Sequence, residues 1–385
     1  MTHEGTADTA HTAHTAGAAA GGNDALTDVA GLRVGHARVP GERALSGTTV
    51  VLAPAGGAVA AVDVRGGGPG TRETDALDPR NLVQRVEAIV LTGGSAYGLD
   101  AAGGVMAWLE EQGRGVPVAP GRVVPVVPAA CVFDLGRGGD WSARPDAATG
   151  RAAVADAAAS PFGAPVPQGD VGAGTGAVVG AVKGGVGTAS TVLKGIGADG
   201  GDVTVAALVV ANAAGSVLDP TTGVLYGHLF HPEEGGFHPE EDGPAGSGAP
   251  GRVRYPDPAV HARAQQRLEK AREASGPPPL NTTLAVVATD ADLTKAQAQK
   301  LAGTAHDGIA RAVRPVHLLN DGDTVFTLAT GAVPLPADHP LALNDVLAAG
   351  ADAVSRAIIK AVLAAASVTG PGGDYPAYRE LYDIK

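Results

Sequence analysis

Short apolar runs alternate with helix-like segments along this chain, and this alternation most limits the folds that it can adopt. Runs of strand length that are apolar throughout are typical of strands buried on both faces. Alternation with helices indicates a mixed α/β fold, although the pattern leaves open which strands are antiparallel. We expect strands at residues 86–91, 176–182 and 203–211, and helices at residues 97–112 and 341–366, the last interrupted near Gly350.

Small residues dominate the composition. The chain has 385 residues, 57 of them glycine, with 44% hydrophobic residues but only 3% aromatic ones. This is ample material for a core, which must be built from Val, Ala, Leu and Ile with close backbone approaches. Cys131 is the only cysteine, so no intramolecular disulfide is possible, and its apolar surroundings predict a buried small hydrophobic residue.

The charge pattern excludes some classes of function. The formal net charge is −12 and no Lys/Arg cluster is present, which argues against nucleic-acid binding. No segment approaches the roughly 20 apolar residues of a membrane-spanning helix, and the N-terminus lacks a signal-peptide pattern. We therefore expect a soluble cytoplasmic protein with no membrane partner.

Two segments of biased composition flank the expected core. Residues 1–24 are mostly Thr, Ala, Gly and His, which predicts a disordered tail. Residues 227–256 carry two His-Pro-Glu-Glu sequences, beginning at His231 and His238, that could in principle bind a metal. Their proline and glycine neighbours favour a flexible insert instead, so we expect no metal. A helix at 258–274 follows.

The junction between Asn281 and Thr282 is the most informative site for function. A Pro-rich break at residues 275–280 runs directly into Asn281, Thr282 and Thr283, followed by an apolar strand at 284–288. Cleavage before Thr282 would create an N-terminal threonine whose α-amine can activate its own hydroxyl. The amine has a pKa of about 7.7–8.0 and can act as a base near neutral pH. A glycosylation sequon and an ordinary loop are the alternatives.

Acidic residues follow in the next strand-entering turn. A helix is expected at residues 293–311, with Asp292 as its N-cap, and a strand at 316–319. Asp321 and Asp323 then lie in a Gly-containing turn before an apolar strand at 324–328. Two carboxylates are thus expected at the mouth of a strand.

With these features the chain resembles the self-processing aminopeptidases that include the L-aminopeptidase/D-esterases, the β-peptidyl aminopeptidases and the nylon-oligomer endohydrolases. The resemblance runs in order over nearly the whole chain from about residue 26. It implies a four-layer αββα sandwich of the N-terminal-nucleophile type. It further implies autocleavage into a large chain, 25–281, and a small chain, 282–385, that form one domain. The matching segments are residues 31–36, 62–70, 91–99, 172–177, 183–185, 210–212, 281–283 and 321–323.

The resemblance also assigns roles to five residues. Thr282 would supply the nucleophile and the amine base, and Asn212 would donate to the developing oxyanion. Lys183 would stabilise negative charge and lower the proton affinity of the amine. Asp321 and Asp323 would orient the new ammonium. Without the resemblance, these could be a surface lysine, a structural asparagine and turn carboxylates.

The implied activity is hydrolysis of amide bonds in aminoalkanoate oligomers or short peptides through an acyl-Thr282 intermediate, without a cofactor. The Asp321-Gly322-Asp323 sequence matches the nylon-type pattern, whereas Phe133 stands where those enzymes carry a tyrosine. An aminopeptidase/D-esterase of small residues, an ornithine-acetyltransferase-like enzyme and an unprocessed binding protein are the alternatives. The resemblance implies a homo-oligomer, a tetramer.

Two glycine-rich segments resemble phosphate-binding loops only superficially. Residues 93–95 precede a helix but lack the Gly-Lys-Ser/Thr ending of a nucleotide loop, and residues 172–176 have no helix behind them. We expect tight turns near a pocket at both places. Ser95 as a serine nucleophile is the rival interpretation, but its surroundings do not match the Gly-x-Ser-x-Gly elbow.

Overall fold

A large mixed sheet carries most of the chain. The computed structural model describes residues 18, 19, 21–231, 253, 255–276 and 280–384. The order in this sheet is β1-β13-β14-β15-β16-β4-β6, in which only β15 and β16 pair in parallel. The strands are β1 (Ala18–Ala19), β4 (Ala58–Val64), β6 (Arg85–Val86), β13 (Gly185–Leu193), β14 (Val203–Ala211), β15 (Leu284–Ala291) and β16 (Thr324–Val333).

A smaller sheet packs on the first in the order β2-β3-β7-β10-β5. Its parallel pair, β7 and β10, is connected through a helix, while the other pairs are antiparallel. The strands are β2 (Arg33–Arg38), β3 (Gly47–Leu52), β5 (Thr71–Arg72), β7 (Ala88–Thr92) and β10 (Ala129–Cys131).

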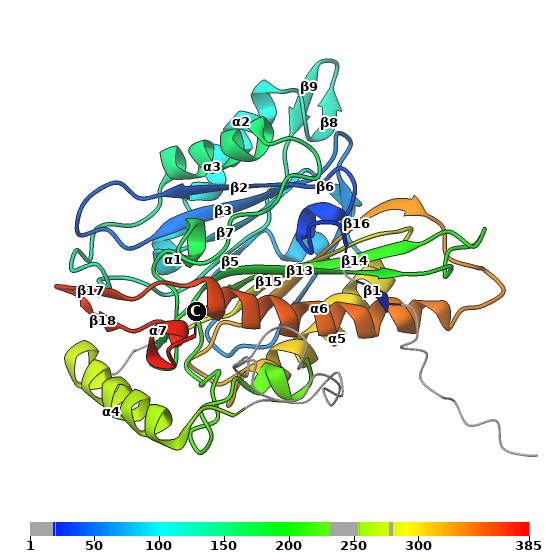
Figure 1. Cartoon of the computed structure of the whole chain (residues 1–385). Helices are drawn as coiled ribbons and strands as arrows, with labels where there is room; N and C mark the ends of the chain where they lie inside the picture. The colour runs from blue at the N-terminus through cyan, green and yellow to red at the C-terminus, as the bar shows by residue number, and fades with distance from the viewer. Residues whose placement is uncertain (1–17, 20, 232–252, 254, 277–279, 385) are drawn as a thin grey trace, which may run out of the picture.

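Helices cover the outer face of each sheet, which gives the predicted four-layer αββα sandwich (Figure 1). Side chains alternate between the faces of a strand. Val51 of β3 therefore joins the core between the sheets, whereas Val50 and Leu52 pack against the helices. The small sheet is covered by α2 (Ala101–Glu111) and α3 (Ala147–Ala159), and the large sheet by α5 (Lys295–Ala312) and α6 (Ala342–Ala364).

The remaining elements lie at the periphery of the sandwich. Helix α4 (Pro258–Ser275) starts at Asp257, whose carboxylate accepts a hydrogen bond from the Ala259 N–H, and it packs beside the β17–β18 hairpin (Figure 1). The others are β8 (Val116–Ala119), β9 (Arg122–Val124), β11 (Val178–Val179), β12 (Val182–Lys183), β17 (Val368–Gly370), β18 (Gly373–Tyr375), α1 (Ser95–Gly98), α7 (Tyr378–Leu381), and the 3-10 helices η1 (Leu26–Asp28), η2 (Asp75–Leu77), η3 (Gly172–Gly174) and η4 (Tyr226–Leu229).

Several expected elements are confirmed and others are wrong. The strand at 203–211 is β14, and the strand at 86–91 is found as β6 and β7. The expected helix at 97–112 divides into α1 and α2, and the expected strand at 176–182 is instead the β11–β12 hairpin. Helix α6 runs unbroken through Gly350, where the expected interruption is absent. The missing side chain instead makes room for Leu301 of α5, since a Cβ at Gly350 would lie 2.6 Å from Leu301 Cδ1.

The region after β15 also differs from expectation. Thr294, not Asp292, caps α5: its Oγ1 accepts from the Gln297 N–H, and the Gln297 side chain accepts from the Thr294 N–H. Residues 316–319 form no strand. The N–H groups of His317 and Leu318 donate to the carboxylates of Asp323 and Asp321 rather than to a neighbouring strand.

The two biased segments fall partly outside the described residues. Residues 18 and 19 form β1, and the Gly21 N–H donates to Ser190 Oγ, so the described end of the segment predicted to be disordered, 1–24, is ordered. Residues 1–17 and 20 lie outside the described residues. Residues 227–229 of the predicted insert belong to η4, and His231 is buried. Residues 232–252, including His238, lie outside the described residues. Within the described part, no three His, Cys, Asp or Glu side chains are grouped to hold a metal.

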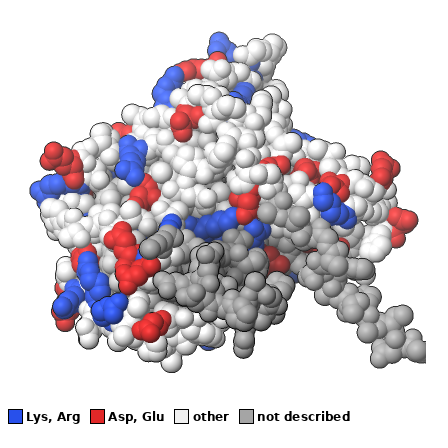
Figure 2. Space-filling model, viewed as in Figure 1, with Lys and Arg blue, Asp and Glu red and all other residues white. Residues whose placement is uncertain are grey.

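The surface has mixed charge on the face shown in Figure 2, where acidic and basic side chains are interspersed in small groups. Among the described helices, none is long and apolar enough to cross a membrane. Cys131 is buried as predicted, and burial raises the pKa of its thiol to about 12.

Candidate active site

Three neighbouring strands of the large sheet bring the predicted site together. Val210 of β14 pairs with Leu284 of β15, so two residues further along the register Asn212 faces Thr282. Leu284 pairs in turn with Thr324 of β16, which places Gly322 beside Thr282 on the other side. Asn212, Thr282 and Gly322 lie just beyond the strand ends, where the register of the three strands brings them side by side.

The peptide bond before Thr282 is buried and held by hydrogen bonds. Thr282 Oγ1 donates to the carbonyl oxygen of Asn281 at 2.6 Å, and the Gly322 N–H donates to the same oxygen at 3.1 Å. The Thr282 N–H donates to the Asn212 carbonyl at 2.9 Å. Both Asn281 and Thr282 are almost completely inaccessible. The hydroxyl thus lies against the carbonyl group that self-cleavage would attack.

Asn212 is adjacent to Thr282, as predicted, but its amide is used differently. Its Nδ2 donates to the carbonyl oxygen of Thr282 at 3.3 Å, not to that of Asn281. Its Oδ1 accepts from Arg137 Nη1 at 2.5 Å and from the Val178 N–H at 3.1 Å. Asn212 therefore positions the backbone of Thr282.

The predicted acidic pair also reaches the junction. Asp323 Oδ1 accepts from the Thr283 N–H at 2.7 Å, and its Oδ2 contacts His317 Nδ1 at 2.8 Å. Asp321 accepts from the backbone N–H groups of Leu318 and Ala214, and its backbone bridges to that of Asn281. Burial raises the pKa of Asp321. Both carboxylates shape the loop around Thr282 through backbone contacts.

Lys183 is fully buried but is directed elsewhere. Its Nζ forms an ion pair with Asp170 at 2.7 Å and donates to the carbonyls of Gly174 and Gly184. Burial lowers its pKa, and Asp170 opposes that effect. The structure therefore does not bring the ammonium into hydrogen-bonding contact with Thr282. The Gly172–Gly174 segment is a tight 3-10 turn, as expected of a turn near the site.

Arg137 also belongs to the site, although sequence reasoning did not select it. Its Nη1 donates to Gly176 O at 2.6 Å as well as to Asn212, and its Nη2 donates to Asn281 Oδ1 at 2.9 Å. Burial lowers the pKa of its guanidinium, although Asp134 opposes this. The sequence feature that could have indicated Arg137 is its position among Gly136, Gly138 and Gly139, a pattern typical of a tightly folded loop.

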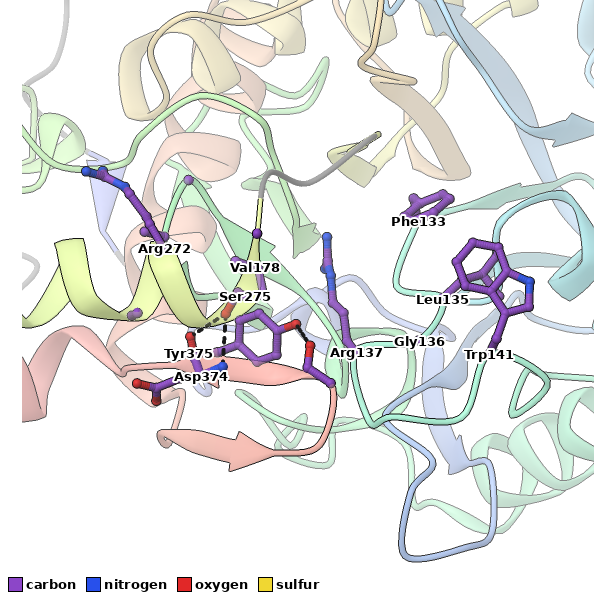
Figure 3. Close-up of a pocket in the computed structure, with 15 residues that line it drawn as sticks. Phe133, Leu135, Gly136, Arg137, Trp141, Val178, Arg272, Ser275, Asp374 and Tyr375 are labelled. Atoms are coloured by element: carbon purple, nitrogen blue, oxygen red, sulfur yellow. Dashed lines mark hydrogen bonds between the residues drawn. The ribbon is translucent and has the colours of Figure 1, made fainter.

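A cavity of about 310 Å³ adjoins the junction at Arg137. In Figure 3, Arg137 extends between Phe133 and Trp141 on one side and Ser275 and Tyr375 on the other. The two rings of Phe133 and Trp141 pack edge to face with centroids 6.1 Å apart. Thr282 does not line this cavity, whereas Arg137 lines it and also binds the side chain of Asn281.

Ser95, the rival nucleophile, lacks comparable support. It follows Gly94 in a turn with positive φ at both residues, and its N–H donates to the Val132 carbonyl. Within the described residues, its hydroxyl forms no hydrogen bond with a histidine or carboxylate that could act as a base.

Comparison with known proteins identifies the family of the chain. The sequence model of peptidase family S58 matches residues 24–375 of this chain. An uncharacterized aminopeptidase of Mycobacterium tuberculosis is 46% identical, covering 93% of this chain and 98% of the relative. A 6-aminohexanoate-oligomer endohydrolase of Kocuria sp. is 30% identical, covering 80% and 76% respectively.

A solved structure supports the same assignment at the level of the fold. The L-aminopeptidase D-Ala-esterase/amidase from Ochrobactrum anthropi, described as a variant of the Ntn hydrolase fold, superposes with a TM-score of 0.67. The superposition covers 95% of this chain and 94% of the other, at 22% identity. The chain therefore belongs to peptidase family S58 and is a hydrolase that acts on amide or peptide bonds.

Proposed function

We propose that the chain cleaves itself between Asn281 and Thr282 and then hydrolyses amides through an acyl-Thr282 intermediate. The observation that carries this proposal is the contact of 2.6 Å between Thr282 Oγ1 and the Asn281 carbonyl oxygen. The same oxygen accepts from the Gly322 N–H, a donor placed where negative charge would develop. A buried hydroxyl, its target carbonyl and an oxyanion donor thus occur together.

Self-cleavage is an acyl shift followed by hydrolysis. Oγ of Thr282 bonds to the Asn281 carbonyl carbon, the carbon–nitrogen bond breaks, and the hydroxyl proton passes to the departing nitrogen. The product is an ester with a free α-amine. Water then adds to the ester, giving the Asn281 carboxylate and restoring the Thr282 hydroxyl. Residues 1–281 and 282–385 remain associated because β15 and β16 lie between β14 and β4 in one sheet.

The mature site would repeat the acyl transfer on external amides. The new α-amine takes the proton from Oγ, and the Gly322 N–H stabilises the oxyanion. Asn212 and the loop formed by Asp321 and Asp323 hold Thr282 in place. Lys183 acts indirectly, through its ion pair with Asp170 beneath the neighbouring glycine turn.

Two substrate classes follow from the relatives. The Kocuria relative is named for endohydrolysis of aminohexanoate oligomers, whereas the mycobacterial relative is named an aminopeptidase. We propose hydrolysis of linear aminoalkanoate oligomers or short peptides, with an apolar part of the substrate in the cavity beside Phe133 and Trp141. Aminopeptidase activity on small residues is the second candidate, favoured by the more similar relative.

Mass spectrometry of the purified protein tests the first step. Two chains ending at Asn281 and beginning at Thr282 are expected, while Thr282→Ala should remain a single chain without activity. A wild-type protein that remains uncut yet fully active would refute the mechanism.

Products from amide substrates with free and with N-acetylated amino groups then distinguish endohydrolysis from aminopeptidase activity. An aminohexanoate oligomer cut at internal bonds supports endohydrolysis. Exclusive release of unblocked first residues supports the aminopeptidase. Acetyl transfer to ornithine without amide hydrolysis would refute both.

A further inference from the structure

Arg137 carries a buried positive charge whose hydrogen-bond partners are all neutral. Only 7% of the residue is exposed, and its three acceptors are one backbone carbonyl and the side-chain oxygens of Asn212 and Asn281. No described carboxylate forms an ion pair with its guanidinium. Burying a charge without hydrogen bonds costs free energy, so each of these three acceptors stabilises the buried guanidinium.

One of the three acceptors belongs to the residue that cleavage releases. Gly176 O and Asn212 Oδ1 are held by Nη1 and stay in the folded structure, whereas Nη2 binds Asn281 Oδ1 at 2.9 Å. The other polar atom of the Asn281 side chain, Nδ2, is buried and has no hydrogen-bond partner. The surroundings of Asn281 therefore recognise an oxygen acceptor and not an amide donor.

In the proposed self-cleavage, Asn281 is the acyl residue, the residue whose carbonyl carbon is transferred to Thr282 Oγ. If Thr282 then attacks external amides in the same geometry, the acyl residue of each substrate occupies the place of Asn281. Its side chain would lie next to Nη2, at the boundary with the cavity (Figure 3).

We propose that Arg137 determines specificity in the mature enzyme by selecting acyl residues that carry an oxygen acceptor where Asn281 Oδ1 lies, the asparagine- and aspartate-like class. This inference rests on the proposed function. An acyl residue of the same shape without that oxygen would leave Nη2 buried without an acceptor. Loss of a hydrogen bond to a charged group is expected to lower kcat/KM by roughly 10- to 100-fold.

Leucine and asparagine provide a matched pair of acyl residues, because their side chains have similar shape and only asparagine offers the oxygen. The experiment measures kcat/KM of the processed wild-type enzyme on the p-nitroanilides of L-asparagine and L-leucine, each with a free and an N-acetylated amino group. We expect asparagine to be preferred by at least about 10-fold. This comparison needs no variant, so it stands even if a substitution prevents folding.

Variants then distinguish selection from general support of the site. Arg137→Met should bring the asparagine-to-leucine ratio close to one, and Arg137→Lys should restore part of it, whereas a purely structural role would lower both rates equally. Arg272→Met is the matched control, because Arg272 lines the same cavity and is exposed. Its ratio should remain that of the wild type.

Each failure has a distinct meaning. A processed enzyme that hydrolyses both anilides with a ratio near one overturns the role of Arg137 and leaves the proposed function standing. A ratio unchanged in Arg137→Met does the same. Absence of hydrolysis of any amide by a correctly processed protein overturns the proposed function and this inference together.

Discussion

Gly322→Ala tests the cleavage geometry directly, because it adds one methyl group beside the nucleophile. A Cβ at this position would lie 2.6 Å from Thr282 Oγ1 and 3.0 Å from the Gly68 carbonyl oxygen. An ordinary contact begins at 3.4 Å, so the hydroxyl or the loop must shift by several tenths of an ångström. Gly322 does not have a positive φ, so alanine causes no backbone strain, and its N–H is retained.

The expected effect of this change is on cleavage far more than on folding. A misplacement of about 1 Å can cost on the order of 10²-fold in rate when reacting groups must be aligned. We expect Gly322→Ala to slow the appearance of the two chains by roughly 10- to 100-fold. The rate is measured after a pulse of protein synthesis, by gel electrophoresis and mass spectrometry of samples taken over time.

Gly103→Ala provides the control, because the space around Gly103 in α2 is open and a Cβ would meet nothing within 4 Å. This variant should cleave at the wild-type rate. If Gly322→Ala, folded by circular dichroism, also cleaves at that rate, the contact between Thr282 Oγ1 and the Asn281 carbonyl is not the reactive one.

Three further predictions concern the supporting residues. Asn212→Ala removes the donor that holds the Thr282 backbone and one acceptor of the buried Arg137, so turnover should fall by about 10²-fold and urea unfolding should show a loss of about 1–3 kcal/mol; a change in turnover below twofold would show that Asn212 does not position Thr282. Lys183→Met leaves Asp170 without its buried partner, so urea unfolding should show a loss of about 3–5 kcal/mol; unchanged stability would contradict the importance of that ion pair. Burial raises the pKa of Asp134 from 3.8 to about 6, so its contribution to stability, about 3 kcal/mol, is present below pH 3.8 and lost as the pH rises through 6. Asp134→Asn should flatten the pH dependence of the free energy of unfolding, measured with urea between pH 4 and 7. An unchanged dependence would contradict the raised pKa of Asp134.

The sequence by itself located two central strands, β14 and β15, and marked the Asn281–Thr282 bond as a candidate cleavage junction. Residues 203–211 and the apolar run after Thr283 are continuous enough to predict buried strands, and the Pro-rich break marks where β15 begins. Such signals are local, because apolar periodicity and chain breakers act over a few residues. The four-layer arrangement came from the resemblance, since the same pattern fits several orders of strands.

Only the tertiary structure decided how the candidate site is assembled. Arg137 lies 75 residues from Asn212 and 144 from Asn281 in the chain, yet it binds both side chains. Likewise, no strand forms at 316–319, where the N–H groups of His317 and Leu318 donate to the carboxylates of Asp323 and Asp321 instead of to a neighbouring strand. Local pattern encodes which residues become buried, whereas strand register and long-range side-chain contacts determine which buried polar groups meet, and these depend on the whole fold.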